Sequence, residues 1–149
     1  MARQRFLPLI RELMECAQEF ERHSAAHVRE LGLTPAQFDI IATLGNTAGM
    51  TCKELGEKTL ITKGTMTGVL DRLQARGIIT RDASPDDGRS WITSLTRKGQ
   101  QLFDEVFPAH MKHLKPLFQS FDDAELVRMH GQLKQLRAAF RQTAANPQR

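Results

Sequence analysis

The side chains best suited to chemistry in this 149-residue sequence lie between positions 51 and 89. The stretch TKGTMTG, residues 62–68, combines one ammonium group with three hydroxyls and two glycines. Ammonium and hydroxyl groups can donate to base edges and phosphates, and threonine also offers a methyl group to thymine. Arg89 follows among turn-forming residues, and a guanidinium there suits a narrow, electronegative minor groove. These residue types predict contacts to nucleic acid.

The net charge of the chain lies around the same residues. The sequence has 21 Lys and Arg against 17 Asp and Glu, a formal charge of +4. Residues 58–99 hold eight basic and four acidic residues, and the remaining positions hold thirteen of each. The whole excess therefore falls in one segment. A localised basic excess is typical of nucleic-acid binding, although a chance fluctuation on a solvated surface explains the charge equally well.

Other chemistry is less well supported by the sequence. Cys16 and Cys52 are too few for a disulfide framework. Cys52 opens a predicted helix, where a thiol can be reactive, so both cysteines are candidates for redox sensing; buried, inert thiols are the favoured interpretation. His110 and His113 lie three apart, but no Cys or His spacing fits zinc. We expect no metal and no cofactor.

The sequence carries no recognisable enzyme motif and no membrane span. It lacks G-x-S-x-G, Walker, dinucleotide-binding and H-E-x-x-H motifs, so we expect no enzyme. No stretch approaches the roughly 18–20 apolar residues of a membrane span. The apolar run near the N-terminus is too short for a signal peptide. We therefore expect a cytoplasmic protein.

The elements that must position these residues begin with helices. Periodicity predicts helices over 5–31, 35–44, 52–59 and 63–76. Thr34, Thr51 and Thr62 stand at the predicted N-cap positions of the last three, and Glu54 follows Thr51 as in a capping box. The third and fourth helices are short, joined by a tight turn, and the fourth is amphipathic. This pattern is typical of a helix-turn-helix.

A hairpin and two more helices follow. The segments 78–82 and 90–95 are predicted strands joined by the turn-rich stretch ASPDDGR, which together describe a wing. Thr96 caps a fifth helix, which Pro108 is expected to kink. Asp122 and Glu125 form a predicted capping box for a sixth helix. The fold class is thus mainly α with a small β-wing.

The first and sixth helices carry apolar rows at alternating spacings of three and four. The N-terminal apolar row is Phe6, Ile10, Leu13, Ala17, Phe20, Ser24, His27 and Leu31; the C-terminal apolar row is Leu126, Met129, Leu133, Leu136 and Phe140. Such rows require packing against other helices. A bundle within one chain would satisfy them. A two-fold dimer is favoured, because it presents a second recognition helix to a second half-site.

The order of these elements resembles the MarR family of bacterial transcription regulators. LGLTPAQFDIIATL resembles the second-helix segment of that family, and TKGTMTGVLDRLQARGIITR resembles its recognition helix and first wing strand. DGRSWITSLTRKG matches the D-x-R wing and L-T-x-x-G pattern at Asp87, Arg89, Leu95, Thr96 and Gly99. The resemblance is good over about residues 31–105, whereas the terminal helices match in pattern only.

The resemblance implies a homodimer that binds a pseudo-palindromic site in double-stranded DNA, usually as a repressor released by a small effector or by oxidation. It implies a winged helix-turn-helix domain over 33–99, dimerisation helices over 1–32 and 100–145, and a tail over 146–149. An interaction or architectural module without effector control is the alternative. A cysteine-based redox regulator is another. The absence of tyrosine disfavours organic-peroxide sensing as that family performs it.

Two sets of site residues follow. The expected DNA contacts are Thr51, Thr62, Lys63, Gly64, Thr65, Thr67, Arg72 and Arg89, with Asp87 supporting the wing. Arg72 could instead pair with nearby acids, and the glycines could be unselected surface positions. The expected effector-binding residues are His23, His27, Arg29 and Phe38, whose imidazole or guanidinium groups could hold an aromatic carboxylate. Packing in the core is the alternative role for the histidines.

Overall fold

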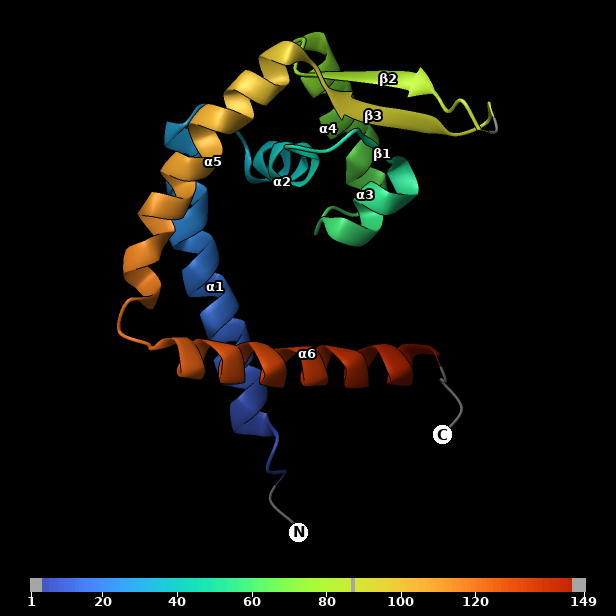
Figure 1. Ribbon diagram of the computed structural model, residues 1–149. Helices are drawn as coiled ribbons and strands as arrows, with labels where there is room; N and C mark the ends of the chain where they lie inside the picture. The colour runs from blue at the N-terminus through green and yellow to red at the C-terminus, as the bar shows by residue number, and fades with distance from the viewer. Residues whose placement is uncertain (1–3, 87, 146–149) are drawn as a thin grey trace. The chain divides into compact units, whose positions relative to one another are not determined.

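A computed structural model describes residues 4–86 and 88–145 (Figure 1). The chain divides into two compact units, Met1–Leu114 and Lys115–Arg149. Asp87 and the predicted tail at 146–149 lie outside the described residues. The first unit contains the expected helix-turn-helix and wing, so it carries the candidate site.

The first unit starts with two helices, α1 (Leu7–Glu30) and α2 (Pro35–Leu44). Gly32, between them, has a φ of 81°, the left-handed conformation that glycine adopts freely at a helix end. A full capping box begins α2: Thr34 Oγ1 accepts from Gln37 N at 3.2 Å, and Gln37 Oε1 accepts from Thr34 N at 3.0 Å. The predicted cap at Thr34 is confirmed.

The helix-turn-helix consists of α3 (Cys52–Lys58) and α4 (Lys63–Ala75). The wing strands are β2 (Ile79–Ala83) and β3 (Trp91–Leu95), which pair antiparallel from Ile79↔Leu95 to Ala83↔Trp91. A third strand, β1 (Met50–Thr51), pairs with β3 and gives the sheet order β1-β3-β2. The sequence prediction missed β1. In Figure 1, β2 and β3 run side by side away from the helices.

One apolar core holds the winged segment together. The fully buried side chains include Ile40, Leu44, Leu55 and Leu73, which come from α2, α3 and α4. Val106 of α5 (Arg97–Phe118) completes the core from a later part of the chain. Met66, Val69, Leu70 and Leu73 of α4 are all buried, which confirms the prediction that this helix is amphipathic. This core fixes α4 against its scaffold.

The start of α5 lies against the sheet. Thr96 Oγ1 accepts from Gly99 N at 3.0 Å, which confirms the predicted cap. A Cβ on Gly99 would overlap the carbonyl oxygen of Ile78, so only glycine fits this close approach. The helix runs on through Pro108 and Pro116 to Phe118, so neither proline ends it.

The second unit contains α6 (Asp123–Ala145). Its predicted capping box is confirmed: Asp122 Oδ1 accepts from Glu125 N at 2.8 Å, and Glu125 Oε2 accepts from Asp122 N at 2.9 Å. No residue of α6, all of which are described, is buried. Its apolar side chains therefore stay accessible to a partner.

Candidate nucleic-acid interface

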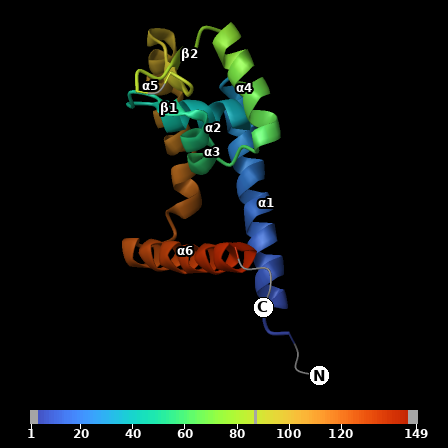
Figure 2. The same cartoon turned by 90° about the vertical axis from the view of Figure 1, so that its right-hand side faces the viewer.

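One face of α4 is buried in the core and the opposite face is open. Among the predicted contact residues, Lys63, Gly64, Thr65 and Thr67 are all exposed at the N-terminal end of this helix. Figure 2 shows α4 at the outer edge of its unit. The geometry therefore presents these four residues together, as a recognition helix requires.

The glycines of α4 have no packing role within the chain. A Cβ built on Gly64 or Gly68 meets no described atom within 4 Å. Each glycine lowers helix stability by about 1 kcal/mol relative to alanine without a compensating internal contact. A smooth helix surface at these positions allows an external partner to approach closely.

The helix N-termini differ from each other in their capping. Thr51 Oγ1 accepts from Glu54 N at 3.2 Å, so the predicted cap of α3 is formed. Thr62 occupies the N-cap position of α4 but forms no side-chain cap; its hydroxyl donates to Thr65 Oγ1 at 3.1 Å. The predicted side-chain cap at Thr62 is therefore wrong. Because this threonine leaves the first amides of α4 uncapped, they can face a phosphate.

The wing is tied to the recognition helix by an arginine that the sequence analysis did not single out. Arg81 of β2 donates to Asp71 Oδ1 at 2.6 Å and to Gln74 Oε1 at 2.7 Å, both on α4. Its side chain is about a quarter exposed, so the ion pair is partly screened from water. Asp71 thus pairs with Arg81, and Arg72 beside it is exposed.

Arg89 lies in the loop between the wing strands and is exposed. Gly88 before it has a φ of 64°, a left-handed conformation typical of a tight turn. Asp87, the predicted wing support, lies outside the described residues. The loop carries Arg89 at the tip of the hairpin, beyond the end of the paired strands.

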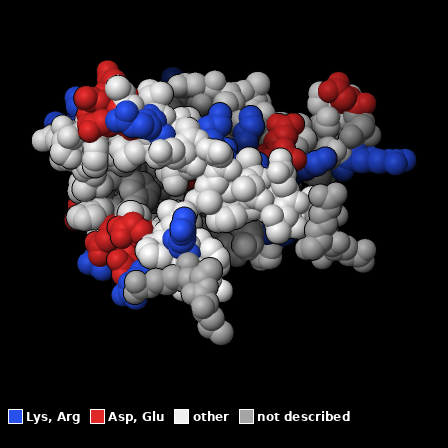
Figure 3. Space-filling view, turned by 90° about the horizontal axis from the view of Figure 1, so that it is seen from below, with Lys and Arg blue, Asp and Glu red and all other residues white. Residues whose placement is uncertain are grey.

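On one face of the molecule, the charged side chains are separated by uncharged surface. On the face shown in Figure 3, Lys and Arg side chains stand singly, several of them beside Asp or Glu, with uncharged surface between them.

A cavity of about 570 Å³ lies directly behind the N-terminal end of α4. Thr62 and Thr65 line it, together with residues of α1, α2 and α5 such as Ser24, Phe38 and His110. All of its lining residues belong to the first unit. A molecule bound there would contact both the recognition helix and the helices that support it.

The polar centre of this cavity is a histidine that the sequence analysis had considered only as a weak metal ligand. His110 is buried; its Nε2 lies 3.1 Å from Ser24 Oγ, and its Nδ1 lies 2.9 Å from His27 Nδ1. His27 stacks on His113 with ring centroids 4.1 Å apart. Burial, followed by the neighbouring charges of His27 and His113, lowers the pKa of His110 below its ordinary 6.5.

The predicted effector residues separate into two groups. Phe38 lines the cavity, and His27 reaches it through its hydrogen bond to His110. His23 and Arg29 are exposed on α1 and are not among the lining residues. Because α1 is only partly covered, its helical periodicity could not tell which of its sides would face α5.

Cys16 and Cys52 are both exposed free thiols, so the expectation of buried thiols is wrong. Within the part of the chain that the structure describes, no three His, Cys, Asp or Glu side chains are grouped so as to hold a metal ion. Among residues 4–86 and 88–145, no helix has the length and apolarity needed to cross a membrane.

Comparison with known proteins agrees with this geometry. A family model described as MarR family matches residues 31–90, which include the helix-turn-helix and most of the wing. The HTH-type transcriptional regulator MhqR of Bacillus subtilis (strain 168) is 26% identical over 130 residues, covering 87% of this chain and 90% of MhqR.

Solved structures share the fold. AbsC, a MarR family transcriptional regulator from Streptomyces coelicolor, matches with a TM-score of 0.83 at 19% identity, covering 95% of this chain and 97% of AbsC. A MarR mutant from E. coli complexed with operator DNA matches with a TM-score of 0.76 at 24% identity, covering 90% of this chain and 99% of that MarR chain. The helix-turn-helix and wing of this chain are therefore similar to those of the MarR family, whose model matches residues 31–90.

Proposed function

We propose that this chain is a MarR-family regulator that binds double-stranded DNA as a homodimer and represses transcription until a small effector releases it. The observation that carries the proposal is the open face of α4, where Lys63, Thr65 and Thr67 project beside two unpacked glycines. A MarR structure with this fold is complexed with operator DNA, which supports the same use of α4 here.

The DNA contacts divide by groove. The N-terminal end of α4 enters a major groove, where Lys63 donates to guanine or phosphate and the threonines contact base edges. The uncapped amides behind Thr62 and the N-terminus of α3 behind Thr51 face phosphates. Arg72 contacts the backbone, and Arg89 at the wing tip enters the adjacent minor groove.

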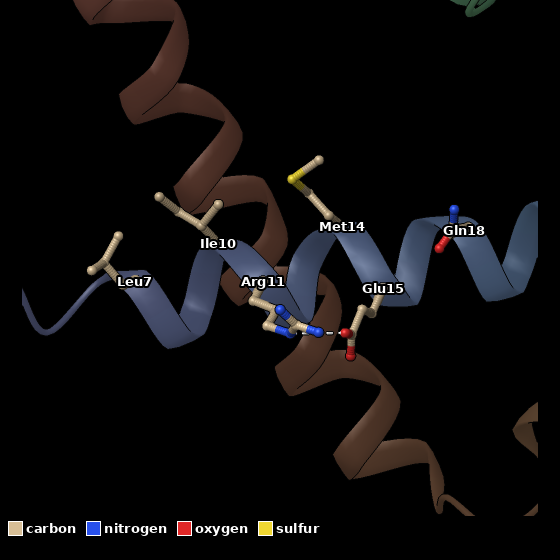
Figure 4. A pocket seen from close by; sticks show the side chains of 6 residues that line it. All are labelled: Leu7, Ile10, Arg11, Met14, Glu15 and Gln18. Atoms are coloured by element: carbon tan, nitrogen blue, oxygen red, sulfur yellow. Dashed lines mark hydrogen bonds and ion pairs between the residues drawn. The ribbon is translucent and has the colours of Figure 1, made fainter.

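Dimerisation explains the exposed apolar side chains of the terminal helices. Leu7, Ile10 and Met14 point to one side of α1 and help to line a shallow hollow of about 420 Å³; Arg11 and Glu15, which pair with each other, also line it (Figure 4). Each of these three apolar residues is more than two-fifths exposed. Exposed apolar rows of this length are typical of surfaces that bury against a second copy.

Effector control is placed in the cavity behind α4. The cavity volume lies within the range of small-molecule sites, and His110 with Ser24 supplies a polar anchor in a mostly apolar lining. A small aromatic or phenolic molecule fits this lining. Thr62 and Thr65, at the start of α4, also line this cavity. A ligand bound in the cavity can therefore shift the start of the recognition helix and release the DNA.

The test is a gel-shift titration of the full chain against the DNA upstream of its own gene, repeated at several salt concentrations. We expect a preferred palindromic fragment and a steep loss of affinity with salt, because phosphate contacts release counterions. Equal binding to all fragments would indicate an architectural protein instead. Complete absence of binding would favour an interaction module.

The same gel-shift assay distinguishes a regulator that responds to oxidation from one that is released by a small effector. Both thiols are exposed, so a mild oxidant can reach them. Release of DNA by oxidant from the wild-type chain, but not from a Cys16→Ser/Cys52→Ser double variant, would favour the redox alternative. We expect oxidant to have the same effect on both proteins.

A further inference from the structure

The cavity behind α4 carries negative charge. Glu21 of α1 and Asp39 of α2 both line it. Its lining, drawn entirely from described residues, includes no lysine and no arginine. With both carboxylates ionised, the lining holds a formal charge of two negatives, which opposes the aromatic carboxylate that the sequence had suggested as a ligand.

His110 does not offset this charge at neutral pH. The imidazole is buried beside His27 and Ser24, and its pKa is lowered, so it remains uncharged. A neutral imidazole has one donor and one acceptor nitrogen, and the Ser24 hydroxyl can satisfy either. The His27 ring is used in its contacts with His110 and His113. The cavity therefore keeps its negative charge.

Aromatic and aliphatic groups surround the two carboxylates. Phe20 and Phe38 line the cavity with Leu60, Met111 and Leu114. Aromatic faces attract cations, and the aliphatic groups favour a hydrocarbon body. Leu60 is 98% exposed in the turn before α4, so an apolar ligand that covers it gains a contact the free protein lacks.

We propose that this cavity binds lipophilic organic cations, in which an aromatic body carries a protonated amine. The ammonium group pairs with the Glu21 and Asp39 carboxylates, while the ring system lies against Phe20 and Phe38. Asp39 Oδ2 already accepts from Leu60 N at 3.0 Å, and a carboxylate can accept a ligand ammonium in addition. This inference rests on the proposed function only in assigning the effector to this cavity.

The position of Asp39 couples such a ligand to α4. Its hydrogen bond to Leu60 N holds the turn that leads into the recognition helix. An ammonium group that binds the same carboxylate can reorient this bond. The Asp39 carboxylate can therefore bind the cation and also couple this binding to the position of α4.

The first experiment compares three compounds that share one ring system. Isothermal titration calorimetry on the full, DNA-free chain uses 2-naphthylmethylamine, 2-naphthylmethanol and 2-naphthoate at neutral pH. We expect the amine to bind most tightly and the carboxylate most weakly. Tighter binding of the carboxylate or the alcohol would overturn the proposal, and so would the absence of binding by all three.

Variants then assign the preference to the two carboxylates. Glu21→Gln and Asp39→Asn should each weaken amine binding about fivefold, as expected for losing a partly exposed ion pair, and leave the alcohol unchanged. The Asp39→Asn change keeps a side-chain oxygen for the Leu60 amide, so the turn is retained. Glu30→Gln is the matched control, because Glu30 lies on the same helix as Glu21 but does not line the cavity. Equal effects in all three variants would overturn the assignment.

A gel shift separates this inference from the proposed function. If the chain binds DNA and the amine, but the amine does not release DNA, the ligand class stands and effector control fails. If the chain binds DNA but shows no preference for the amine, the proposed DNA binding stands and the cation site fails.

Discussion

The winged segment and the terminal helices share the same amphipathic periodicity but differ in where their apolar faces lie. In α4, thirteen residues long, Met66, Val69, Leu70 and Leu73 are buried within the chain. In α6, twenty-three residues long and fully described, none is buried. Periodicity therefore predicts a helix with an apolar face, but it does not show whether the same chain covers that face.

The largest expected difference between the two regions is in folding stability. Leu73→Ala should lower the free energy of unfolding by about 2–5 kcal/mol, because it leaves a cavity in a closed core. Val127→Ala on α6 shortens an exposed side chain and should change the free energy of unfolding by no more than about 0.5 kcal/mol. Urea denaturation of both variants measures the difference. Similar losses would mean that α6 is part of the same core.

The next prediction concerns association. Leu133→Glu places a carboxylate in the C-terminal apolar row and should raise the dimer dissociation constant at least about tenfold, since an unpaired buried charge is costly. Gln132→Glu, its exposed neighbour, introduces the same charge outside the row. Sedimentation equilibrium compares the two variants. A dimer unaffected by Leu133→Glu would exclude this row from the interface.

A third prediction separates DNA binding from both folding and association. Arg89→Ala should weaken binding of the preferred DNA fragment about tenfold, because a guanidinium is lost from the minor groove. Because Arg89 is exposed, we expect its loss to lower the melting temperature far less than Leu73→Ala does. Arg22→Ala, at an exposed position on α1 away from the wing, is the matched control. Unchanged affinity in a gel-shift titration of Arg89→Ala would remove the wing from the proposed DNA interface.

The smallest effect is expected from the buried imidazole that joins α1 to α5. Folding lowers the pKa of His110 below 6.5, so the unfolded chain binds a proton more readily than the folded chain. The contribution of this group to stability is therefore present above about pH 6.5 and is lost as the pH falls towards the lowered value. Each pKa unit corresponds to about 1.4 kcal/mol.

His110→Gln keeps hydrogen-bonding atoms and removes the titration. Thermal unfolding over a pH series on both sides of 6.5 should show a weaker acid dependence in this variant than in the wild type. His23→Gln, at an exposed position on α1, should leave the dependence unchanged. An identical pH profile for all three proteins would contradict the assignment to His110.

Local signals explain which parts of the fold could be predicted. The caps at Thr34, Thr51 and Asp122 join residues three positions apart, so the residue types at these positions are enough to predict where the helices start. The two-residue strand β1 was missed because it forms by pairing Met50 with Thr93, far along the chain. Thr62 has a residue type that commonly caps helices, but its hydroxyl donates a hydrogen bond to the Thr65 hydroxyl instead.

The candidate sites follow the same division. Lys63, Thr65 and Thr67 were predictable because they share the polar face of one helix opposite its buried residues. His110, Glu21 and Asp39 meet from three helices, so no short segment could reveal their cavity. Arg81 reached Asp71 and Gln74 only after β2 had turned back beside α4.

From the sequence we could predict the order of the helices and of the two wing strands, the apolar face of α4 and the polar residues opposite it, because these depend on neighbours within a few positions. Only the tertiary structure decided which histidine is buried, which arginine ties the wing to α4, and that two carboxylates share the cavity behind α4. These features arise from contacts across the fold, where packing brings together residues that are far apart in the chain.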